Sequence, residues 1–578
     1  MNLSVAPCDD FYEYACGNVH QQEEEIDNEL DEVTEHLLGK TEYLLGLVDL
    51  AESLNVSSEL RVAQRFYNAC LEADLHPFPA ADPYYLEVIR SIGGFPAVDG
   101  ASWNASNFSW FNMSVHMTNY GVEGLIAERI HPGYPYPPYL DFQRAFLGIN
   151  HFISTYYTDS KRFTGYEQNE EVMRKYLRAF KLPQDKIAEV IDGVFAFWRE
   201  AFEVDSEHKK AGNCEIFEPN YYKIVWNQNT TKEVCNVYFE QMDKVCARHP
   251  EAVANYLAMK LLYAFDPKLQ NSNQQRDYCD RTLRSSMVFL LNKLYLAEHF
   301  NEKTKLEVLK IAEDVRTSLR ISLHEADWLN GMDRNEDLLR DPPIDLYWEN
   351  LLDRLVSEIG RVEIANDSYA KTNVKIQRLI VEIKRYISRH INELPESSKL
   401  PKSMLFDIGR IVLLLEPPVY DSSSPFSLKF AVLGRLLAGY IFKNNFINYD
   451  YDNDGKDYNK RVQCVLDFSN GHVSNDNKWK YENIIINMRL VFSAYQIHLK
   501  NMLKDSEHEK INETIPGLDL SPNQLFFLRY TQGFCSRPND LARLLVVASF
   551  ATSENVSQAF NCPVGSKMRP TAKLCDLV

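Results

Sequence analysis

Two histidine–glutamate pairs in this chain resemble the start of a zinc-binding motif. Zinc hydrolases often carry H-E-x-x-H on a helix, because two histidines four residues apart share one helical face and the glutamate can act as general base. The pairs at 324–325 and 508–509 begin this pattern, but Trp328 and Asn512 stand where the second histidine is required. No H-E-x-x-H occurs anywhere in the chain. We therefore predict that neither pair is a metal site.

An acidic turn near residue 450 has the spacing of a calcium-binding loop. Asp450, Asp452 and Asp454 alternate before Gly455, so their carboxylates could converge on one hard cation while the glycine allows a sharp turn. The twelfth position of such a loop calls for glutamate, but it is Arg461. Asp-rich and Gly-containing stretches are also common in plain turns. We interpret this segment as a loop.

An apolar stretch contains one charge whose burial needs compensation. The first half of residues 428–455 is apolar on every face, which predicts a helix inside a large core. Arg435 interrupts it. A guanidinium cannot be deprotonated in a protein, and burying it without a partner would cost several kcal/mol. The elements around this helix must therefore supply a compensating group.

The elements that position these residues are expected to be mostly helical. Residues 23–80, 170–340 and 347–391 have the apolar pattern of helices. The segment 93–165 is richer in Gly, Pro and aromatic residues and is predicted to form strands and loops. A polar stretch at 335–343 is interpreted as a connection between lobes.

Composition limits the class of protein. With 578 residues, 67.0 kDa and 45% hydrophobic residues, the chain is expected to form two or more domains. A net charge of -19 and a pI near 5.3 argue against nucleic acid or an anionic membrane surface as partner. The sequence has no apolar run of about 20 residues that could span a bilayer. Its first ten residues lack the features of a signal peptide, so we expect any targeting segment to lie outside this sequence.

Cysteines and glycosylation sequons point to an oxidising, glycosylating compartment. The chain has eleven cysteines and nine N-x-S/T sequons, of which the first is at Asn2. The other eight are glycosylation candidates, at Asn55, Asn104, Asn107, Asn112, Asn229, Asn366, Asn512 and Asn555. Five cysteine pairs would leave one thiol, which we expect among Cys214, Cys235 and Cys246.

Both ends of the chain carry recognisable signatures. Residues 7–18 read PCDDFYEYACGN, residues 523–535 read NQLFFLRYTQGFC, and residues 559–563 read AFNCP. These resemble the neprilysin-like family of zinc metalloendopeptidases, of the neprilysin and endothelin-converting enzyme type. The resemblance implies a mainly α fold with small β-sheets, a two-lobed ectodomain in which a thermolysin-like (gluzincin) lobe encloses a cavity. It implies a mostly helical N-terminal region at 1–340 and a degenerate C-terminal metallopeptidase region at 341–578.

The same resemblance implies four disulfide bonds. The expected pairs are Cys8–Cys562, Cys16–Cys535, Cys70–Cys279 and Cys464–Cys575. The first two would close loops of hundreds of residues, each worth on the order of 5 kcal/mol on the chain-entropy model. They would tie the first 50 or so residues to the C-terminal lobe.

The zinc site of the family is absent from this sequence. In the family, G-H-E-x-x-H follows a proline pair and supplies two zinc ligands and the general base. The flanking residues remain here, but Arg435, Leu436 and Gly439 replace the first His, the Glu and the second His. Glu482 corresponds to the third ligand, while Ile486 replaces the Asp that orients a ligand histidine. We therefore predict that zinc, the family's cofactor, is lost.

Other parts of the family's active site are also missing. Residues 398–401 (SKLP) stand at the place of the strand that holds substrate by β-augmentation. No His occurs between Cys535 and Cys562, where the family has a His that stabilises the oxyanion. We expect Arg435 and Glu482 to form an ion pair across the vacated metal position.

Three functions remain open at this stage. We prefer an extracellular pseudopeptidase, either secreted or a plasma-membrane ectodomain, that binds peptides or pairs with active family members without cleaving. One alternative is a zinc-dependent metalloendopeptidase with residual activity; we find no Ser/His/Asp or Cys/His constellation that would support hydrolysis by other groups. Another alternative is a cell-surface scaffold that has no peptide ligand.

Overall fold

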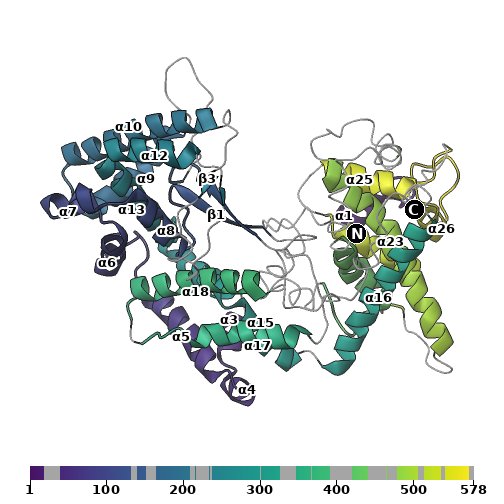
Figure 1. Ribbon diagram of the computed structural model, residues 1–578. Helices are drawn as coiled ribbons and strands as arrows, with labels where there is room; N and C mark the ends of the chain where they lie inside the picture. Colours follow the sequence, from purple (N-terminus) through teal and green to yellow (C-terminus); the bar gives the residue numbers. More distant parts are fainter. Residues whose placement is uncertain are drawn as a thin grey trace. The chain divides into compact units, whose positions relative to one another are not determined.

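The computed structural model is mainly helical (Figure 1). It describes residues 1–18, 40–131, 139–150, 165–208, 215–216, 233–234, 237–299, 301–325, 347–365, 367–390, 419–439, 464, 478–505, 513–535 and 540–571. Contacts divide the chain into two compact units. Unit 1 comprises residues 1–42, 292–350 and 395–578, and unit 2 comprises residues 43–291 and 351–394. Both units are discontinuous in sequence.

Unit 2 consists of helices and two short strand pairs. Its helices are α4 (Val48–Ser53), α5 (Ser57–Glu72), α6 (Pro83–Ile92), α7 (Pro96–Asp99), η2 (Gly100–Ser102), η3 (Ala105–Asn107), α8 (Trp110–Thr118), α9 (Tyr166–Ala179), α10 (Gln184–His208), α12 (Val237–Arg248), α13 (Pro250–Phe265), η4 (Ser272–Gln274), α14 (Gln275–Ser286) and α18 (Tyr369–His390). The antiparallel pairs are β1 (Ile126–His131) with β2 (Tyr139–Arg144), and β3 (Glu215–Ile216) with β4 (Glu233–Val234). Three helices contain residues of both units: α3 (Thr41–Leu45), α15 (Val288–His299) and α17 (Tyr347–Gly360).

Apolar spacing explains how α5 is held in unit 2. Leu60, Ala63 and Phe66 recur at three-residue steps and are buried, as expected for one face of a helix packed on a core. Cys70 extends this face by one turn and bonds to Cys279 of α14, with an S–S distance of 2.02 Å. The predicted Cys70–Cys279 disulfide is therefore present and joins two helices that are far apart in sequence.

The prediction of strands and loops for residues 93–165 is wrong for part of that segment. Strands β1 and β2 do lie in it, but α8 is a helix. Ser109 caps α8, since its Oγ accepts a hydrogen bond from the backbone N–H of Asn112 at 3.2 Å. Met113 and Met117, four residues apart, are fully buried in the core of unit 2. A cap and tertiary packing thus form a helix where local composition favours turns.

Unit 1 has a long helix pair at its centre. Its helices are α1 (Phe11–Cys16), α16 (Glu302–Glu325), α20 (Phe426–Lys429), η9 (Phe430–Gly434), α23 (Lys478–Asp505), α24 (Pro522–Gln532), α25 (Asp540–Ala551) and α26 (Glu554–Ala559). Helices α16 and α23 pack against each other and cross in the view of Figure 1. The Ser318 hydroxyl donates to the carbonyl of Leu490 at 2.8 Å. Asp314, one turn earlier on α16, contacts His498, two turns later on α23. These contacts show that the two helices run antiparallel.

The N-terminus is part of the core of unit 1. The Phe11 ring lies 5.0 Å from that of Phe550 and 4.9 Å from that of Phe560, measured between centroids. The predicted disulfides Cys8–Cys562 and Cys16–Cys535 are both present, with Cα separations of 5.4 and 5.3 Å. The start of the chain is thus tied to its C-terminal helices, as the resemblance implies.

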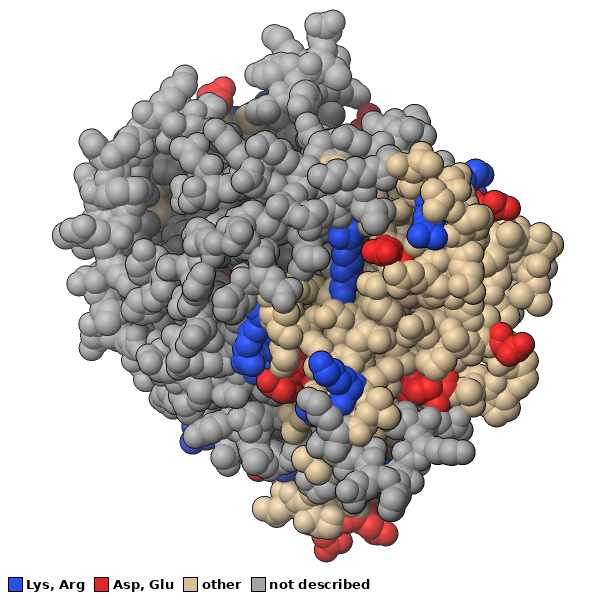
Figure 2. Space-filling view, turned by 90° about the vertical axis from the view of Figure 1, so that its right-hand side faces the viewer, with Lys and Arg blue, Asp and Glu red and all other residues tan. Residues whose placement is uncertain are grey.

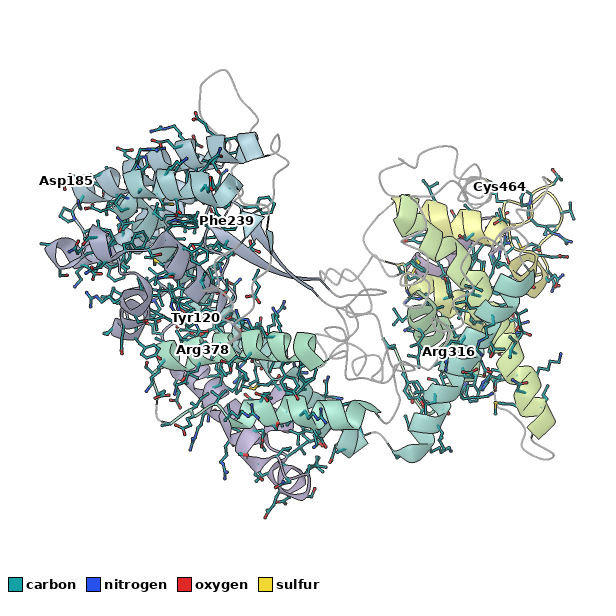
Figure 3. All side chains as sticks on the ribbon, viewed as in Figure 1. Tyr120, Asp185, Phe239, Arg316, Arg378 and Cys464 are labelled. Carbon is teal, nitrogen blue, oxygen red and sulfur yellow. A yellow bond between two sulfur atoms is a disulfide. The ribbon has the colours of Figure 1, made fainter. Side chains whose placement is uncertain are left out.

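Side chains fill the space between the helices within each unit (Figure 3). On the face shown in Figure 2, acidic and basic side chains of the described residues are interspersed. Among the described residues, no helix is long and apolar enough to cross a membrane.

Candidate functional site

The helix that carries Arg435 is irregular just before that residue. The short α20 leads into η9, a π-helical segment, and residues 435–439 continue as α-helix. The N–H of Arg435 donates to the carbonyl of Phe430, five residues earlier, which defines the π turn. Such turns inside α-helices occur frequently at functional sites. The predicted core helix is therefore correct, and its irregular turn lies immediately before Arg435.

Close packing surrounds the π-helical segment. Phe430 and Val432 are buried in the core of unit 1. A Cβ atom at Gly434 would lie 3.1 Å from Cγ1 of Val491 on α23, so the absence of a side chain permits the close approach of the two helices. Apolar packing on this face agrees with the helix expected inside a large core.

The Arg435 side chain packs against the end of α24. Its Cζ lies 5.0 Å from the centroid of the Phe534 ring, a cation–π distance. A Cβ atom at Gly533 would lie only 2.6 Å from Nη2 of Arg435, so this placement of the guanidinium depends on glycine. Burial raises the pKa of Tyr530, and the nearby charge of Arg435 partly offsets the rise. The guanidinium is thus held at the C-terminal end of α24, and Leu436 and Gly439 follow Arg435 on its own helix.

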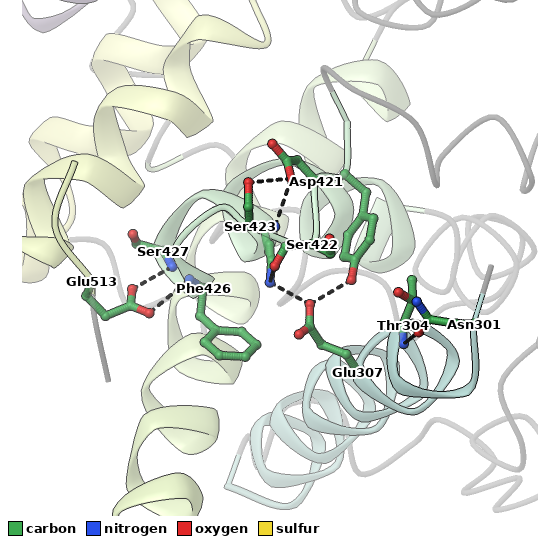
Figure 4. Close-up of polar contacts among 11 residues, drawn as sticks. Asn301, Thr304, Glu307, Asp421, Ser422, Ser423, Phe426, Ser427 and Glu513 are labelled. Carbon is green, nitrogen blue, oxygen red and sulfur yellow. Dashed lines mark hydrogen bonds and ion pairs between the residues drawn. The ribbon is translucent and has the colours of Figure 1, made fainter. Parts of the chain in front are cut away.

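A second charge of this helix is more deeply buried than Arg435. Lys429 is 3% exposed, and its Nζ lies 2.6 Å from Oε1 of Glu307 on α16 (Figure 4). The same ammonium donates to the carbonyl of Ser422 at 2.8 Å and lies 4.7 Å from the Phe426 ring centroid. The hydroxyl of Tyr420 donates to Oε1 of Glu307 at 2.7 Å. The inference that Arg435 is the one charge in this stretch is therefore incomplete.

A distant carboxylate caps the start of the helix. Glu513 is 7% exposed, and its two oxygens accept the backbone N–H groups of Phe426 and Ser427, each at 2.9 Å (Figure 4). These N–H groups have no partner within the helix, and a negative charge there also interacts favourably with the helix dipole. The Tyr495 hydroxyl donates to Oε2 of Glu513 at 3.1 Å, which links the cap to α23. No local sequence signal could have identified Glu513, because it is 87 residues from Phe426.

An Asp–His pair lies beside this helix. Nδ1 of His498 is 2.6 Å from Oδ2 of Asp314, and both side chains are almost fully buried. The imidazole ring is 4.3 Å from the Phe426 ring and 5.1 Å from the Phe430 ring, between centroids. Its Nε2 has no hydrogen-bond partner among the described residues. Such a pair often orients a metal-bound histidine, but zinc needs at least three protein ligands.

The described residues do not assemble a metal site. None of their His, Cys, Asp or Glu side chains form a group of three or more that could hold an ion. Glu482 and Ile486 belong to α23, in the part of that helix whose side chains the structure does not describe. The Arg435–Glu482 ion pair therefore stays a prediction. Residues 398–401 and 450–461 lie outside the described residues.

The remaining cysteines are partly assigned. Cys464 is disulfide-bonded, and its side chain is labelled in Figure 3. Its predicted partner, Cys575, lies outside the described residues, as do Cys214 and Cys235. Cys246 is a buried free thiol, and burial followed by the charge of Asp243 raises its pKa. Cys246 is thus an unpaired member of the three cysteines singled out in the sequence.

The glycosylation candidates differ in exposure. Asn55, Asn104, Asn107, Asn112 and Asn555 are exposed. Asn229, Asn366 and Asn512 lie outside the described residues. Exposure is required for a glycan to remain on a folded protein, so five of the eight candidates meet this condition.

Similar proteins agree with this fold. Relatives in sequence include Neprilysin-1 of Caenorhabditis elegans, 21% identical over 99% of this chain and 89% of the relative. Endothelin-converting enzyme 1 of Cavia porcellus is 22% identical over 100% of this chain and 87% of that protein. In structure, the zinc metalloprotease Zmp1 of Mycobacterium tuberculosis in its open state matches with a TM-score of 0.57 and 13% identity, over 98% of both chains. PepO from Lactobacillus rhamnosis matches with a TM-score of 0.55 and 13% identity, also over 98% of both chains.

A third solved structure, described as the Haemonchus galactose-containing glycoprotein complex, matches with a TM-score of 0.59. It is 15% identical and covers 100% of this chain and 97% of its own. The sequence pattern of peptidase family M13 matches residues 7–215 and 223–338, which together are more than half of the chain. The chain therefore belongs to peptidase family M13, as a distant homologue of the neprilysins and endothelin-converting enzymes.

Proposed function

We propose that this M13 homologue does not hydrolyse peptides through zinc and acts by binding, either to extracellular peptides or to active relatives. Zinc-dependent hydrolysis needs a metal-bound water, a base to deprotonate it and a donor for the oxyanion. The observation that carries the proposal is the identity of three residues on one helix. Arg435, Leu436 and Gly439 offer neither an imidazole nor a carboxylate.

The positive charge of Arg435 also disfavours zinc binding. A guanidinium keeps its charge at every physiological pH. Arg435 is held against Gly533 and Phe534, which restricts its freedom to swing away. A dication at the neighbouring position would be repelled by this fixed charge, and the repulsion is strongest where water is excluded. Arginine at position 435 therefore opposes zinc binding more strongly than the loss of a ligand alone would.

The proposed location is extracellular. Three disulfides join residues that are 209 to 554 positions apart in sequence. Disulfides persist in oxidising compartments and are rare where glutathione keeps thiols reduced. A binding protein in this location would meet peptides and the ectodomains of other family members.

Metal analysis and peptide cleavage test the proposal together. The secreted full chain is expected to carry less than one zinc per molecule and to show no chelator-sensitive cleavage of fluorogenic peptides. The matched control is the triple variant Arg435→His, Leu436→Glu, Gly439→His, which restores H-E-x-x-H and keeps Glu482. We expect it to bind more zinc than the natural chain. Stoichiometric zinc and chelator-sensitive cleavage in the natural chain would refute the proposal.

Binding is measured separately. A mixture of extracellular peptides is passed over the immobilised chain, and co-purification with an active family member is measured in parallel. Saturable binding of either class supports the proposal. If neither class binds, the chain is not a binding protein of this kind, even when its lack of zinc is established.

A further inference from the structure

Two exposed lysines of unit 2 have a left-handed backbone. Among the described residues other than glycine, four have a positive φ, and they are Asn55, Lys181, Lys268 and Asn561. Asparagine adopts this conformation more readily than lysine does. Lys181 lies two residues after the end of α9 with φ 58°, and Lys268 lies three residues after the end of α13 with φ 57°. Glycine is the usual residue at such helix ends, so a strained lysine at both places indicates a use for the two ammonium groups.

A buried carboxylate joins Lys268 to α9. Asp266 is 4% exposed, and its Oδ2 lies 2.6 Å from Nζ of Lys175 and accepts the Tyr176 hydroxyl at 2.8 Å. Its Oδ1 accepts the backbone N–H of Lys268 at 2.7 Å, and its carbonyl accepts a hydrogen bond from Nζ of Lys268 at 3.2 Å. The same ammonium lies 4.0 Å from the Tyr263 ring centroid. One carboxylate thus holds two ammonium groups near each other, and the group keeps a net positive charge.

Helix α9 extends this positive charge. Lys175 and Arg178 are three residues apart and lie on the same side of the helix, about 5 Å apart along its axis. The N–H of Lys181 donates to the carbonyl of Arg178 at 2.8 Å, which keeps Lys181 at this end of the helix. All four cations are exposed. We call Lys175, Arg178, Lys181 and Lys268 the α9 basic surface.

Helix stability explains only part of this arrangement. A cation in the last turn interacts favourably with the helix dipole, so Arg178 alone would indicate nothing further. Lys268, however, belongs to a different segment. Elsewhere on unit 2, the exposed Lys186 and Arg361 pair with Glu189 and Glu358, at 2.9 and 2.8 Å. On the α9 basic surface, by contrast, neither Arg178 nor Lys181 forms an ion pair with another described residue.

We propose that the α9 basic surface binds a sulfated polysaccharide. Sulfate esters stay ionised at physiological pH, and a chain that carries them at intervals can contact cations of two segments at once. A polysaccharide is also stiffer than an acidic peptide and loses less conformational entropy on binding. The net charge of -19 acts weakly here, because charges more than about 8 Å away are largely screened at physiological ionic strength. The local excess of cations therefore decides the contact.

Heparin is the probe for the first test. The secreted full chain is passed over immobilised heparin at physiological ionic strength, with dextran and poly-glutamate as comparison surfaces. We expect saturable binding to heparin that weakens as salt is added, weaker binding to poly-glutamate and none to dextran. Absence of saturable heparin binding would overturn the proposal. Binding to poly-glutamate that is as tight as binding to heparin would overturn the choice of ligand.

Matched variants locate the binding surface. The double variant Lys181→Asn, Lys268→Asn removes two charges and places a residue that tolerates the left-handed backbone at each position. Its affinity for heparin should fall about tenfold, because two exposed charge contacts are lost. The pair Lys181→Gly, Lys268→Gly should give the same loss, since glycine also adopts this backbone without strain.

The control has the same change in net charge. In Lys186→Gln, Arg361→Gln, two exposed cations that already pair with carboxylates are removed. Its affinity for heparin should stay within about twofold of that of the natural chain, because the α9 basic surface is intact. An equal loss in the control and the asparagine pair would show that binding follows net charge alone and would overturn the assignment, as would unchanged affinity of the asparagine pair.

Discussion

Nζ of Lys429 lies 2.6 Å from Oε1 of Glu307, so a buried ion pair joins α16 to the helix that carries Arg435. Their side chains are 3% and 17% exposed. Tyr420 shares the same carboxylate oxygen, and burial followed by Glu307 raises the pKa of its phenol. The pair is therefore almost enclosed by protein and is positioned by three elements of unit 1.

Breaking this pair from one side is expected to be costly. Lys429→Met should lower the free energy of unfolding by about 3–5 kcal/mol, because it leaves the Glu307 charge buried without its cation. Glu307→Gln should have a similar effect, and the double variant should recover much of the loss. Chemical unfolding followed by tryptophan fluorescence measures each change.

The control for this prediction is an exposed ion pair of the same unit. Arg320 and Glu313 are 3.2 Å apart and are 45% and 41% exposed. Arg320→Met should change the free energy of unfolding by about 0–1 kcal/mol, as is usual for surface pairs. If Lys429→Met were as mild as Arg320→Met, the Lys429–Glu307 pair would not stabilise unit 1 in the way described.

The degree to which the sequence predicted the site depended on the range of the interactions. The helix around Arg435 was predictable because its apolar residues lie next to one another in sequence. Glu513 and Glu307 were not predictable, since each meets this helix only through the tertiary fold. The burial of Lys429 was missed for the same reason, because a lysine at the edge of an apolar run is ordinarily solvated.

Some features of the fold could likewise be predicted from the sequence, and others could not. The three described disulfides agree with the pairs implied by the family resemblance, which carries long-range information that spacing alone does not contain. The helix α8 was missed because local composition favoured turns, whereas packing of Met113 and Met117 decided the structure. The predicted cavity and the Arg435–Glu482 pair remain predictions.

The stability of unit 2 should depend on pH through Lys260. Its Nζ donates to the carbonyls of Gly124 and Phe146, at 3.3 and 3.2 Å, and to the Tyr256 hydroxyl at 3.2 Å. Burial lowers the pKa of Lys260 to about 8, from 10.5 in an unperturbed lysine, and Glu123 partly opposes the change. Between these two values the folded state binds fewer protons than the unfolded state. Stability due to this residue therefore rises with pH across that window.

The variant Lys260→Met should remove this dependence. Between pH 8 and 10.5, the unfolding free energy of the natural chain should rise relative to the variant by at most about 3 kcal/mol, because one pKa unit corresponds to about 1.4 kcal/mol. Lys186→Met is the control, since its exposed ammonium pairs with Glu189 on the surface. Parallel pH profiles of the natural chain and Lys260→Met would contradict the assignment.

The third prediction concerns the pairing of Cys214 and Cys235. Cys214 and Cys235 lie outside the described residues, directly before Glu215 and directly after Val234. Glu215 pairs with Val234 in the antiparallel β3–β4 register. Continuing that register by one residue pairs positions 214 and 235, and opposed antiparallel residues have Cα separations suited to a disulfide. We predict that Cys214 and Cys235 are bonded and that Cys246 is the odd thiol.

Peptide mapping without reduction checks this prediction. A cross-linked peptide containing positions 214 and 235 is expected, and iodoacetamide should label only Cys246, and only after unfolding, because the native thiol is buried. The variant Cys246→Ala should then leave no alkylated cysteine. Labelling of Cys214 or Cys235 in the unfolded, unreduced chain would contradict the pairing.

The last prediction concerns the position where the family holds zinc. Helix η9 packs against α23, the helix that carries Glu482, and we predict that Arg435 pairs with Glu482. The two charged groups could form a bidentate, charge-assisted pair that takes over the cross-linking role of the metal. Arg435 would then stabilise the fold by pairing with Glu482 and by packing on Phe534.

Double-mutant analysis separates these two contributions. Arg435→Leu and Glu482→Leu should each lower the free energy of unfolding by about 3–5 kcal/mol, because each removes one partner of the predicted pair. The double variant should recover much of that loss if the residues interact, whereas independent effects would add. Lys500→Leu, an exposed change on α23, is the control and should alter stability by about 0.5 kcal/mol or less. Additive losses in the double variant would show that Arg435 is held by packing on Phe534 rather than by Glu482.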